Sequence, residues 1–426
     1  MRLSWRTCAG VGWSLCFASA AAAQQPLTWA DVRDRFRATN PAVQAGRIGV
    51  DESKAAEVTA YLRPNPQWSL TLDQIGDTEN GNAFSASNLL TTFGYLHERE
   101  GKRELRRDSA HGATDLTTSG QLDLERNMLF TLRGAFIQLL QAKAFRTLAL
   151  DNLASYDQVL TVSRDRLRSG DIAQIDLDRL ELQRVPYESD VQTAEVNLRT
   201  AKIQLLRLLG DQTTPVDQFD VSGPYEFSSP QKSLEEVRRA ALDTRPDLRA
   251  AVQAVDKAKI DHRLAVANGS ADPTFTVDAA FPSISQAHLS YQPPLDAYFG
   301  VTMGVPLRIF DKNQGEKART QLDIGRNEKL ADAARQQVIG DVDTAYATIV
   351  SAVALLQPYR DRYLTQATRV RDTVQFSYQR GGASLMDFLQ SQQDYRSVQV
   401  GYVNLVAAYL NAVNQLNLAV GQEVLP

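Results

Sequence analysis

Cysteine is nearly absent from this chain of 426 residues, and both copies, Cys8 and Cys16, lie close to the N-terminus. The first 23 residues read as a signal peptide, with a positively charged start, a mostly apolar stretch and small residues, Ala21 to Ala23, at a cleavage site. The mature chain is therefore expected to contain no cysteine, which excludes disulfides and thiol chemistry.

Two other interpretations of the leader are weaker. An anchor helix would need a longer apolar stretch than Cys8 to Ala20. A lipidated Cys16 would normally follow a small residue, whereas Leu15 precedes it here and Trp13 lies three positions back. Residues 1–23 are therefore predicted to be a cleaved signal peptide.

Features of enzymes and of nucleic-acid-binding proteins are also missing. The formal net charge is -4, and no basic patch points to a nucleic acid. The four histidines are scattered, and the His-Glu pair at His97 has no second histidine, as a zinc-protease motif would require. The spacing of Asp311, Asn313 and Gly315 fits a turn better than a calcium loop. The sequence thus predicts no catalysis, no cofactor, no metal site and no nucleic-acid partner.

Long hydrophobic runs are lacking after the leader. No apolar run reaches the ~18 residues that a membrane helix needs. A membrane-spanning part would have to consist of β-strands closed into a barrel, because only helices and closed barrels satisfy their backbone hydrogen bonds in lipid.

The two halves of the chain are instead similar to each other in sequence. At an offset of 205, Val32 and Pro41 match Val237 and Pro246, and further on Gly101 is paired with Gly315. At an offset of 211, three residues of the first half have counterparts in the second: Gly170 matches Gly381, Asp176 matches Asp387, and Gly210 matches Gly421. The sequence therefore predicts a duplicated unit of about 200 residues rather than a short solenoid repeat.

Each half is expected to contain a proline-interrupted helix, two strands and a long helical hairpin. For the first repeat, residues 24–210, these are 28–61, 67–74 with 87–96, and 116–209. For the second repeat, residues 233–426, they are 233–267, 274–281 with 297–307, and 316–420. A proline-rich connector, residues 211–232, is expected to pack outside the helices.

The predicted strands alternate apolar and polar residues, which is the weak signature of outer-membrane strands. A half-buried soluble sheet is the alternative for any one of them. Aromatic residues in or beside these strands are candidates for interfacial aromatic belts: Trp68, Phe93, Tyr95, Tyr298 and Phe299.

The predicted hairpins repeat apolar residues with spacings of three and four, which indicates coiled-coil packing. A second apolar seam containing Val196 and Ile203 indicates a helix packed on both sides, as in a wall of helices. Pro186 and Pro358 are expected to kink or locally unwind their helices. Each hairpin turns at a glycine, Gly170 or Gly381.

The mature chain resembles the TolC-like outer-membrane efflux protein family, because it contains several short motifs of that family in the same order. They are Thr39-Asn40-Pro41, Thr244-Arg245-Pro246, Arg63-Pro64-Asn65-Pro66, the segment from Val305 to Asp311 with Gly315, and Tyr378-Gln379-Arg380-Gly381 with Leu385 and Asp387.

The resemblance implies a mixed α/β membrane protein with mostly long α-helices. A homotrimer would form a periplasmic α-barrel and a transmembrane β-barrel, with four strands from each subunit. It also implies an outer-membrane location in a Gram-negative bacterium, with contact to outer-membrane lipid. The function implied is a passive conduit for efflux or secretion, coupled to a periplasmic adaptor and a proton-driven or ATP-driven inner-membrane pump. A periplasmic scaffold or adaptor without a pore is the alternative.

By the same resemblance, the hairpin tips close the periplasmic entrance and contact the adaptor. The residues of this chain that match the family's hairpin tips are Ser169, Gly170, Asp171, Gly381, Gly382 and Ala383. Asp387 and Asp176 are the expected gate carboxylates, although each also lies where a carboxylate stabilises a helix N-terminus. Gln390 replaces a second aspartate found in other family members, so the acidic ring is expected to be weaker here.

Overall fold

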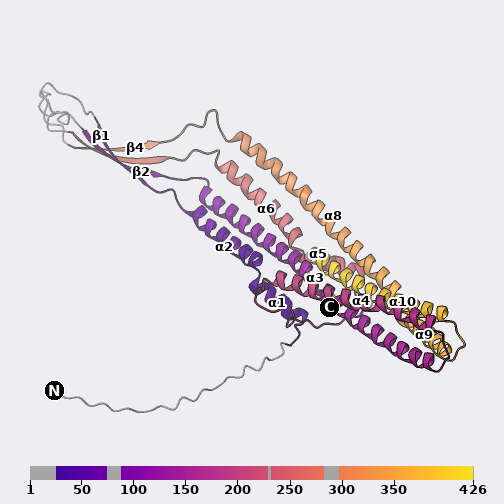
Figure 1. The fold of residues 1–426 in the computed structure, drawn as a ribbon. Coiled ribbons are helices and arrows are strands. Elements are labelled where there is room, and N and C mark those ends of the chain that lie inside the picture. The colour runs from indigo at the N-terminus through magenta and orange to yellow at the C-terminus, as the bar shows by residue number, and fades with distance from the viewer. Residues whose placement is uncertain (1–24, 74–87, 229–231, 283–296, 426) are drawn as a thin grey trace, which may run out of the picture.

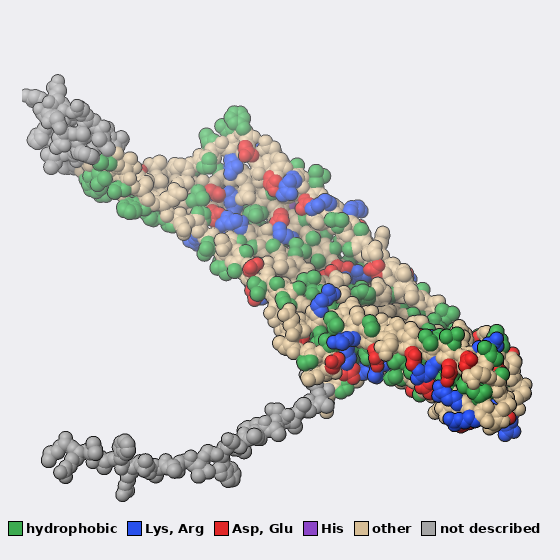
Figure 2. All heavy atoms as spheres, viewed as in Figure 1, with side chains coloured by type: hydrophobic (Ala, Val, Ile, Leu, Met, Phe, Trp, Pro, Cys, Tyr) green, Lys and Arg blue, Asp and Glu red, His purple; other side chains and the backbone are tan. Residues whose placement is uncertain are grey.

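The structure is a computed structural model that describes residues 25–73, 88–228, 232–282 and 297–425. The predicted signal peptide lies outside the described residues. The described chain is elongated, with a small sheet at one end and the turns of the helical hairpins at the other (Figure 1). Charged side chains are concentrated on the helical body, while hydrophobic ones cover part of the sheet (Figure 2).

The sheet has four antiparallel strands in the order β1-β2-β3-β4. Their bounds are Gln67–Asp73, Asn88–Leu96, Thr274–Pro282 and Tyr298–Gly304. The central pair, β2 and β3, joins the two halves of the chain. The last strand ends at Gly304, before the position near 307 that alternation predicted. Val305 and Leu307 continue the apolar pattern beyond the strand, and both are exposed.

Two short helices precede each strand pair, where a single proline-interrupted helix was expected. They are α1, Trp29–Thr39, with α2, Pro41–Tyr61, and α5, Leu234–Thr244, with α6, Pro246–Ala267. The helices separate because a proline holds the preceding residue in an extended conformation and can itself only begin a helix. Both α1 and α5 start with a capping box, formed by Thr28 with Asp31 and by Ser233 with Glu236.

The first hairpin is longer than the sequence pattern indicated, and the second begins and ends within two residues of its predicted bounds. The first hairpin is α3, Lys102–Arg168, with α4, Gln174–Leu209. The second is α8, Gln314–Pro358, then α9, Leu364–Gln379, and α10, Leu385–Val420. With 67 residues, α3 is roughly 100 Å long. It begins at Lys102 instead of near 116.

A left-handed residue precedes both α3 and α8. Gly101 has φ 62° and ψ 25°, and Asn313 has φ 62° and ψ 29°. Glycine and asparagine adopt this conformation more readily than other residues. Gly101 therefore has its structural counterpart in Asn313, and not in Gly315, the residue that the sequence comparison aligned with it.

The two helical prolines behave differently. After Pro358 the chain forms a π-helix, Tyr359–Tyr363, before α9 begins. This change in winding is the local disturbance that a proline produces when it removes a backbone donor. In contrast, α4 passes through Pro186 with no assigned break. The local unwinding predicted at Pro186 is not observed.

The long helices form a wall. Towards the sheet, α2 packs on α3, α3 on α6, and α6 on α8. Towards the tips, α4 packs on α3, α3 on α10, and α10 on α9. Both free edges of the wall expose apolar side chains, including Ile48 and Val58 on α2 and Leu322 and Leu330 on α8.

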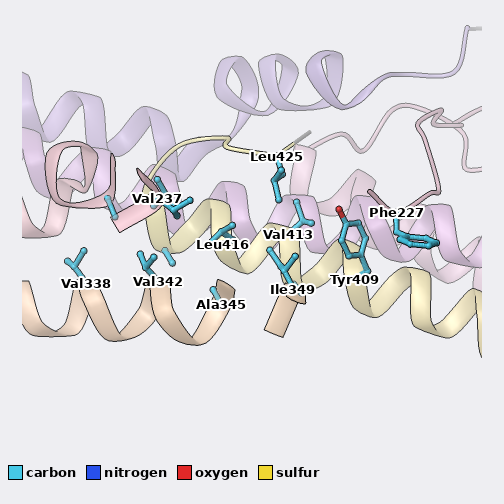
Figure 3. Packing of buried hydrophobic residues seen from close by; sticks show 14 of the residues in the cluster. Phe227, Val237, Val338, Val342, Ala345, Ile349, Tyr409, Val413, Leu416 and Leu425 are labelled. Atoms are coloured by element: carbon cyan, nitrogen blue, oxygen red, sulfur yellow. The ribbon is translucent and has the colours of Figure 1, made fainter. Parts of the chain in front are cut away.

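The hydrophobic core is divided between the two halves of the chain. One cluster lies around α3 and α4 and contains Phe36 and Leu139. The other lies around α8 and α10, where Val342, Ile349 and Leu416 face one another (Figure 3). The connector after α4, which is predicted to pack outside the helices, contributes buried side chains to both clusters, among them Val221 and Phe227.

One helical stretch of the described residues, Gln314–Gln379, is long and apolar enough to cross a membrane by length and composition alone, with a mean hydropathy of 1.4 in its best window. From the sequence, no such stretch is predicted after the signal peptide. The stretch comprises α8, the π-helix and α9, which pack on α5, α6 and α10.

Candidate functional site at the hairpin tips

The first hairpin turns over residues 169–173. Gly170 has a φ of 81°, which favours glycine, and its N–H donates to the carbonyl of Leu167 at 3.0 Å. The N–H of Asp171 donates to the carbonyl of Arg166 at 2.9 Å. This pair of bonds closes the helix end and leaves Ser169, Gly170 and Asp171 exposed at the tip.

The second hairpin turns in a similar way. Gly381 has a φ of 77°, and the N–H of Gly382 donates to the carbonyl of Ser377 at 2.8 Å. Gly381 and Gly382 are exposed, whereas Ala383 is half-buried and packs against the core of the tips. The structure therefore places all six predicted contact residues at the turns of the two hairpins.

A separate aromatic cluster lies behind these turns and joins the two hairpins. Tyr156 stacks on Tyr187 with 4.6 Å between ring centroids, and Tyr378 stacks on Phe388 at 4.9 Å. All four side chains are buried in one cluster with Leu180. The sequence reading did not single out this cluster, although Tyr378 belongs to the motif that marked the second tip.

Tyr378 is also held by a charged residue of the other hairpin. The Arg166 guanidinium donates to the carbonyl of Tyr378 at 2.9 Å and lies 5.3 Å from its ring centroid. The Tyr378 hydroxyl is buried with no hydrogen-bond partner among the described residues. Burial raises the pKa of Tyr378, the positive charge of Arg166 lowers it, and the negative charge of Asp176 raises it. Asp176 is half-buried next to the first tip.

Asp387 caps its own helix. Its carboxylate accepts from the Ser384 hydroxyl at 2.7 Å and from the Ser384 N–H at 3.2 Å, and its N–H donates to the Ser384 hydroxyl at 3.1 Å. These bonds from Ser384 lower the pKa of the Asp387 carboxyl. The side chain is nevertheless exposed, so the cap leaves its charge open to the solvent at the tip. Gln390 is exposed one turn on, and its amide donates to Asp394 at 2.8 Å.

The candidate aromatic belt lies at the other end of the molecule. Trp68 is opposite Phe93 in the register, and Tyr95 lies two residues further along the same face. Phe299 shares that face through its pairing with Ala279, which is opposite Thr91. Tyr298 is adjacent to Phe299 and therefore points to the opposite face, because side chains alternate along a strand. Four of the five residues predicted for the belt therefore share the apolar face of the sheet, and Tyr298 lies on the other face.

The family comparison matches the second half of the chain. Residues 237–422 match the model of the family described as Outer membrane efflux protein. This range runs from α5 past the end of α10 and includes the second hairpin tip.

Curated relatives extend the similarity over more of the chain. The outer membrane efflux protein BepC of Brucella suis is 23% identical over 70% of this chain, and the match spans just under two thirds of BepC, 66%. The pyoverdine export outer membrane protein OpmQ of Pseudomonas putida is 21% identical, over 89% of this chain and 82% of its own length.

Solved structures share the fold. CusC matches with a TM-score of 0.73 and 17% identity, over 92% of each chain. The open state of the MtrE outer membrane channel of Neisseria gonorrhoeae matches with a TM-score of 0.74 and 15% identity, over 93% of this chain and 89% of that one. The resemblance predicted from the sequence is thereby confirmed: this chain is similar to the TolC-like outer-membrane efflux proteins, in sequence to the family model over residues 237–422 and in fold over about nine-tenths of its length.

Proposed function

We propose that this chain is the outer-membrane channel subunit of a tripartite efflux or secretion system. It acts as a passive conduit from the periplasm to the exterior and does no chemistry. The family description and the names of BepC and OpmQ give an outer-membrane location and outward transport. The function and location predicted from the sequence agree with them.

The open edges of the protomer are the observation that carries this proposal. The sheet ends in β1 on one side and β4 on the other, and the wall of helices ends in α2 and α8. Because β1 follows α2 and β4 precedes α8, each free strand continues a free helix. A surface with two different open edges closes into a ring by head-to-tail association.

In that ring, β1 and α2 of one copy lie against β4 and α8 of the next. Closure satisfies the backbone groups of the edge strands and covers the apolar side chains exposed on α2 and α8. Four strands are too few for a barrel, since the smallest known barrels have about eight. Three copies, giving twelve strands, are the number that the family resemblance implies.

The proposed two-fold repeat of the chain, residues 24–210 and 233–426 around the connector 211–232, is supported by paired local features. Both halves have a capping box at the first helix, a proline at the start of the second and a left-handed glycine at the hairpin turn. With this arrangement, the wall of helices consists of two similar halves that lie side by side and derive from one ancestral unit.

The experiment that tests the function is reconstitution of the purified protein into planar bilayers. Discrete ion-conducting steps are expected, and the protein should stay with outer membranes after carbonate washing. A periplasmic scaffold would be released by carbonate and would give no steps. Carbonate release together with silent bilayers would overturn the channel assignment.

At the periplasmic entrance we propose that Asp387 and Asp176 line the constriction, with Gln390 one turn behind Asp387. The six exposed or half-exposed tip residues, 169–171 and 381–383, would contact the adaptor, which couples the duct to an inner-membrane pump. The position of these residues at the end farthest from the sheet supports this arrangement (Figure 1).

Asp387→Ala is expected to leave the oligomer intact and to change single-channel conductance or its dependence on cations. Removing the exposed carboxylate takes one negative charge per subunit from the entrance. Because the pKa of the Asp387 carboxyl is lowered, it stays ionised down to a pH below its ordinary titration range, so the difference from wild type should be constant between pH 6 and 8.

Ser384→Ala is the matched control for that variant, because it breaks the cap but keeps the carboxylate. Loss of either side of the cap costs about 1 kcal/mol of helix stability. If Ser384→Ala changes conductance as much as Asp387→Ala does, Asp387 acts only as a cap and its role in the gate is refuted.

A further inference from the structure

A cavity of about 480 Å³ lies where the two halves of the chain meet, away from the hairpin tips. It is bounded by α1, the middle of α3, the start of α6 and the end of α10. Of these elements, α3, α6 and α10 are central in the protomer, whereas α1 packs on α2, α3 and α4.

The lining of the cavity contains more arginines than carboxylates. Five arginines and two glutamates are its charged residues: Arg33, Arg37, Arg126, Arg133, Arg249, Glu125 and Glu423. All of these arginines except Arg249 are already in ion pairs: Arg33 and Arg133 with Glu423, Arg37 with Glu125, and Arg126 with Asp123 and Asp247. The whole chain carries a formal net charge of -4. A concentration of arginine in one cavity of an acidic protein favours anionic ligands, because guanidinium groups pair with carboxylates in a bidentate manner.

The cavity already holds one carboxylate from a peptide segment of the chain itself. Glu423, just after the end of α10, accepts from the Trp29 indole N–H at 2.6 Å and from Arg133 at 3.2 Å. Arg133 in turn lies 5.0 Å from the Trp29 ring centroid. The segment is fixed next to this carboxylate by Leu425, which belongs to the second core cluster and lies over Val413 (Figure 3).

On the opposite side of the cavity, Arg126 is paired and Arg249 is not. The Arg126 guanidinium lies 2.6 Å from the Asp123 carboxylate and donates to the Leu418 carbonyl at 2.9 Å, although its Nε is buried without a hydrogen-bond partner among the described residues. Arg249 is exposed, and it forms no ion pair or side-chain hydrogen bond with the described part of the chain. Apolar side chains, including Leu122, Leu129 and Phe130, line the space between the charged groups.

We propose that this cavity binds an acidic peptide segment of another periplasmic protein, with carboxylates paired to Arg249 and the neighbouring arginines. The volume lies within the range of specific ligand sites, about 300–1,000 Å³. The mixture of arginines and apolar side chains fits a peptide that carries both carboxylates and apolar residues. Glu423 followed by Val424 and Leu425 is such a segment, and it is held by the same cavity.

Peptide binding to the cavity can be measured through the fluorescence of Trp29, which lines it. After removal of the leader the chain contains two tryptophans, Trp29 and Trp68, so Trp68→Phe leaves Trp29 as the single reporter. The purified full-length protein in detergent is titrated with acetyl-Val-Glu-Glu-Leu-amide, and binding is followed by Trp29 fluorescence and by calorimetry. The uncharged acetyl-Val-Gln-Gln-Leu-amide is the matched peptide control.

The acidic peptide is expected to bind and the neutral peptide to bind at least about tenfold more weakly, with the difference decreasing at high salt. Arg249→Gln should weaken binding of the acidic peptide about tenfold. Arg263→Gln is the matched control, because Arg263 is also an exposed arginine of α6, about four turns beyond the cavity. It should bind like wild type.

Three results would each overturn the proposal. The first is equal binding of the acidic and neutral peptides, which would show an apolar pocket with no charge recognition. The second is equal binding by the Arg249→Gln and Arg263→Gln variants. The third is no peptide binding, including the case where the small dicarboxylate isophthalate binds and the peptide does not, which would make this a site for small anions.

Discussion

Val301→Arg is expected to abolish assembly of the protein in the outer membrane, whereas Thr302→Arg, one residue further along the same strand, is expected to assemble. Val301 lies in the middle of β4, pairs with Val277 and is 80% exposed in the protomer. Its side chain shares the apolar face with Phe299 and Met303. In the proposed barrel this face contacts lipid, where arginine near the bilayer midplane costs about 2–4 kcal/mol per copy.

Thr302 points to the other face of the sheet, together with Thr276 and Gly300, because side chains alternate along the strand. In the proposed barrel this face lines the lumen, where water can solvate an arginine. The measurement is the amount of each variant in carbonate-washed outer membranes, compared at equal expression. If the two variants assemble equally, or if only Thr302→Arg fails, the apolar face of the sheet does not contact lipid.

These two faces could be predicted from the sequence, because the period of two assigns every residue of a strand to one side. The same rule would have separated Tyr298 from Phe299, since neighbouring residues never share a face. The end of β4 was harder to predict. Val305 and Leu307 continue the alternation, but the structure has no strand beyond Gly304.

The start of α3 shows why helix bounds were less predictable than strand faces. Its first turns, from Lys102, are polar on most sides and lack the apolar spacing that marks a coiled coil. Polar contacts with α6 hold this part of the helix instead. The Ser119 hydroxyl donates to the Gln253 side chain at 2.7 Å, and Ser109 donates to Asp261. Such contacts join residues far apart in the sequence, so a local pattern does not reveal them.

At the hairpin tips, too, the local turns could be predicted from the sequence, whereas the contacts between distant residues could not. Gly170 and Gly381 could be placed at the turns because each follows a helical pattern and has the left-handed conformation that glycine favours. The contact between the hairpins could not be predicted locally, since Arg166 and Tyr378 are 212 residues apart. For Asp387, the capping interpretation is supported by its bonds to Ser384, and the gate interpretation stays a proposal.

Phe388→Ala should loosen the contact between the hairpins and raise single-channel conductance. Phe388 is fully buried, stacks on Tyr378 at 4.9 Å and lies in the cluster with residues of both hairpins. Replacing a buried phenylalanine by alanine costs about 3–5 kcal/mol, because apolar contacts are lost and a cavity remains. The loss is confined to the tips, so the oligomer and its barrel should persist. Since the tips are proposed to close the entrance, weaker packing between them should widen it.

Met386→Ala is the matched control, because Met386 lies in the same turn of α10 but is 75% exposed. It should conduct and unfold like wild type. The readouts are single-channel conductance in planar bilayers and thermal unfolding of the purified protein. A Phe388→Ala channel that unfolds at a lower temperature but conducts like the Met386→Ala channel would show that the aromatic cluster stabilises the tips without holding the entrance closed. The constriction would then have to depend on contacts between neighbouring copies near the tips, where α4 and α9 are the outer helices of each protomer.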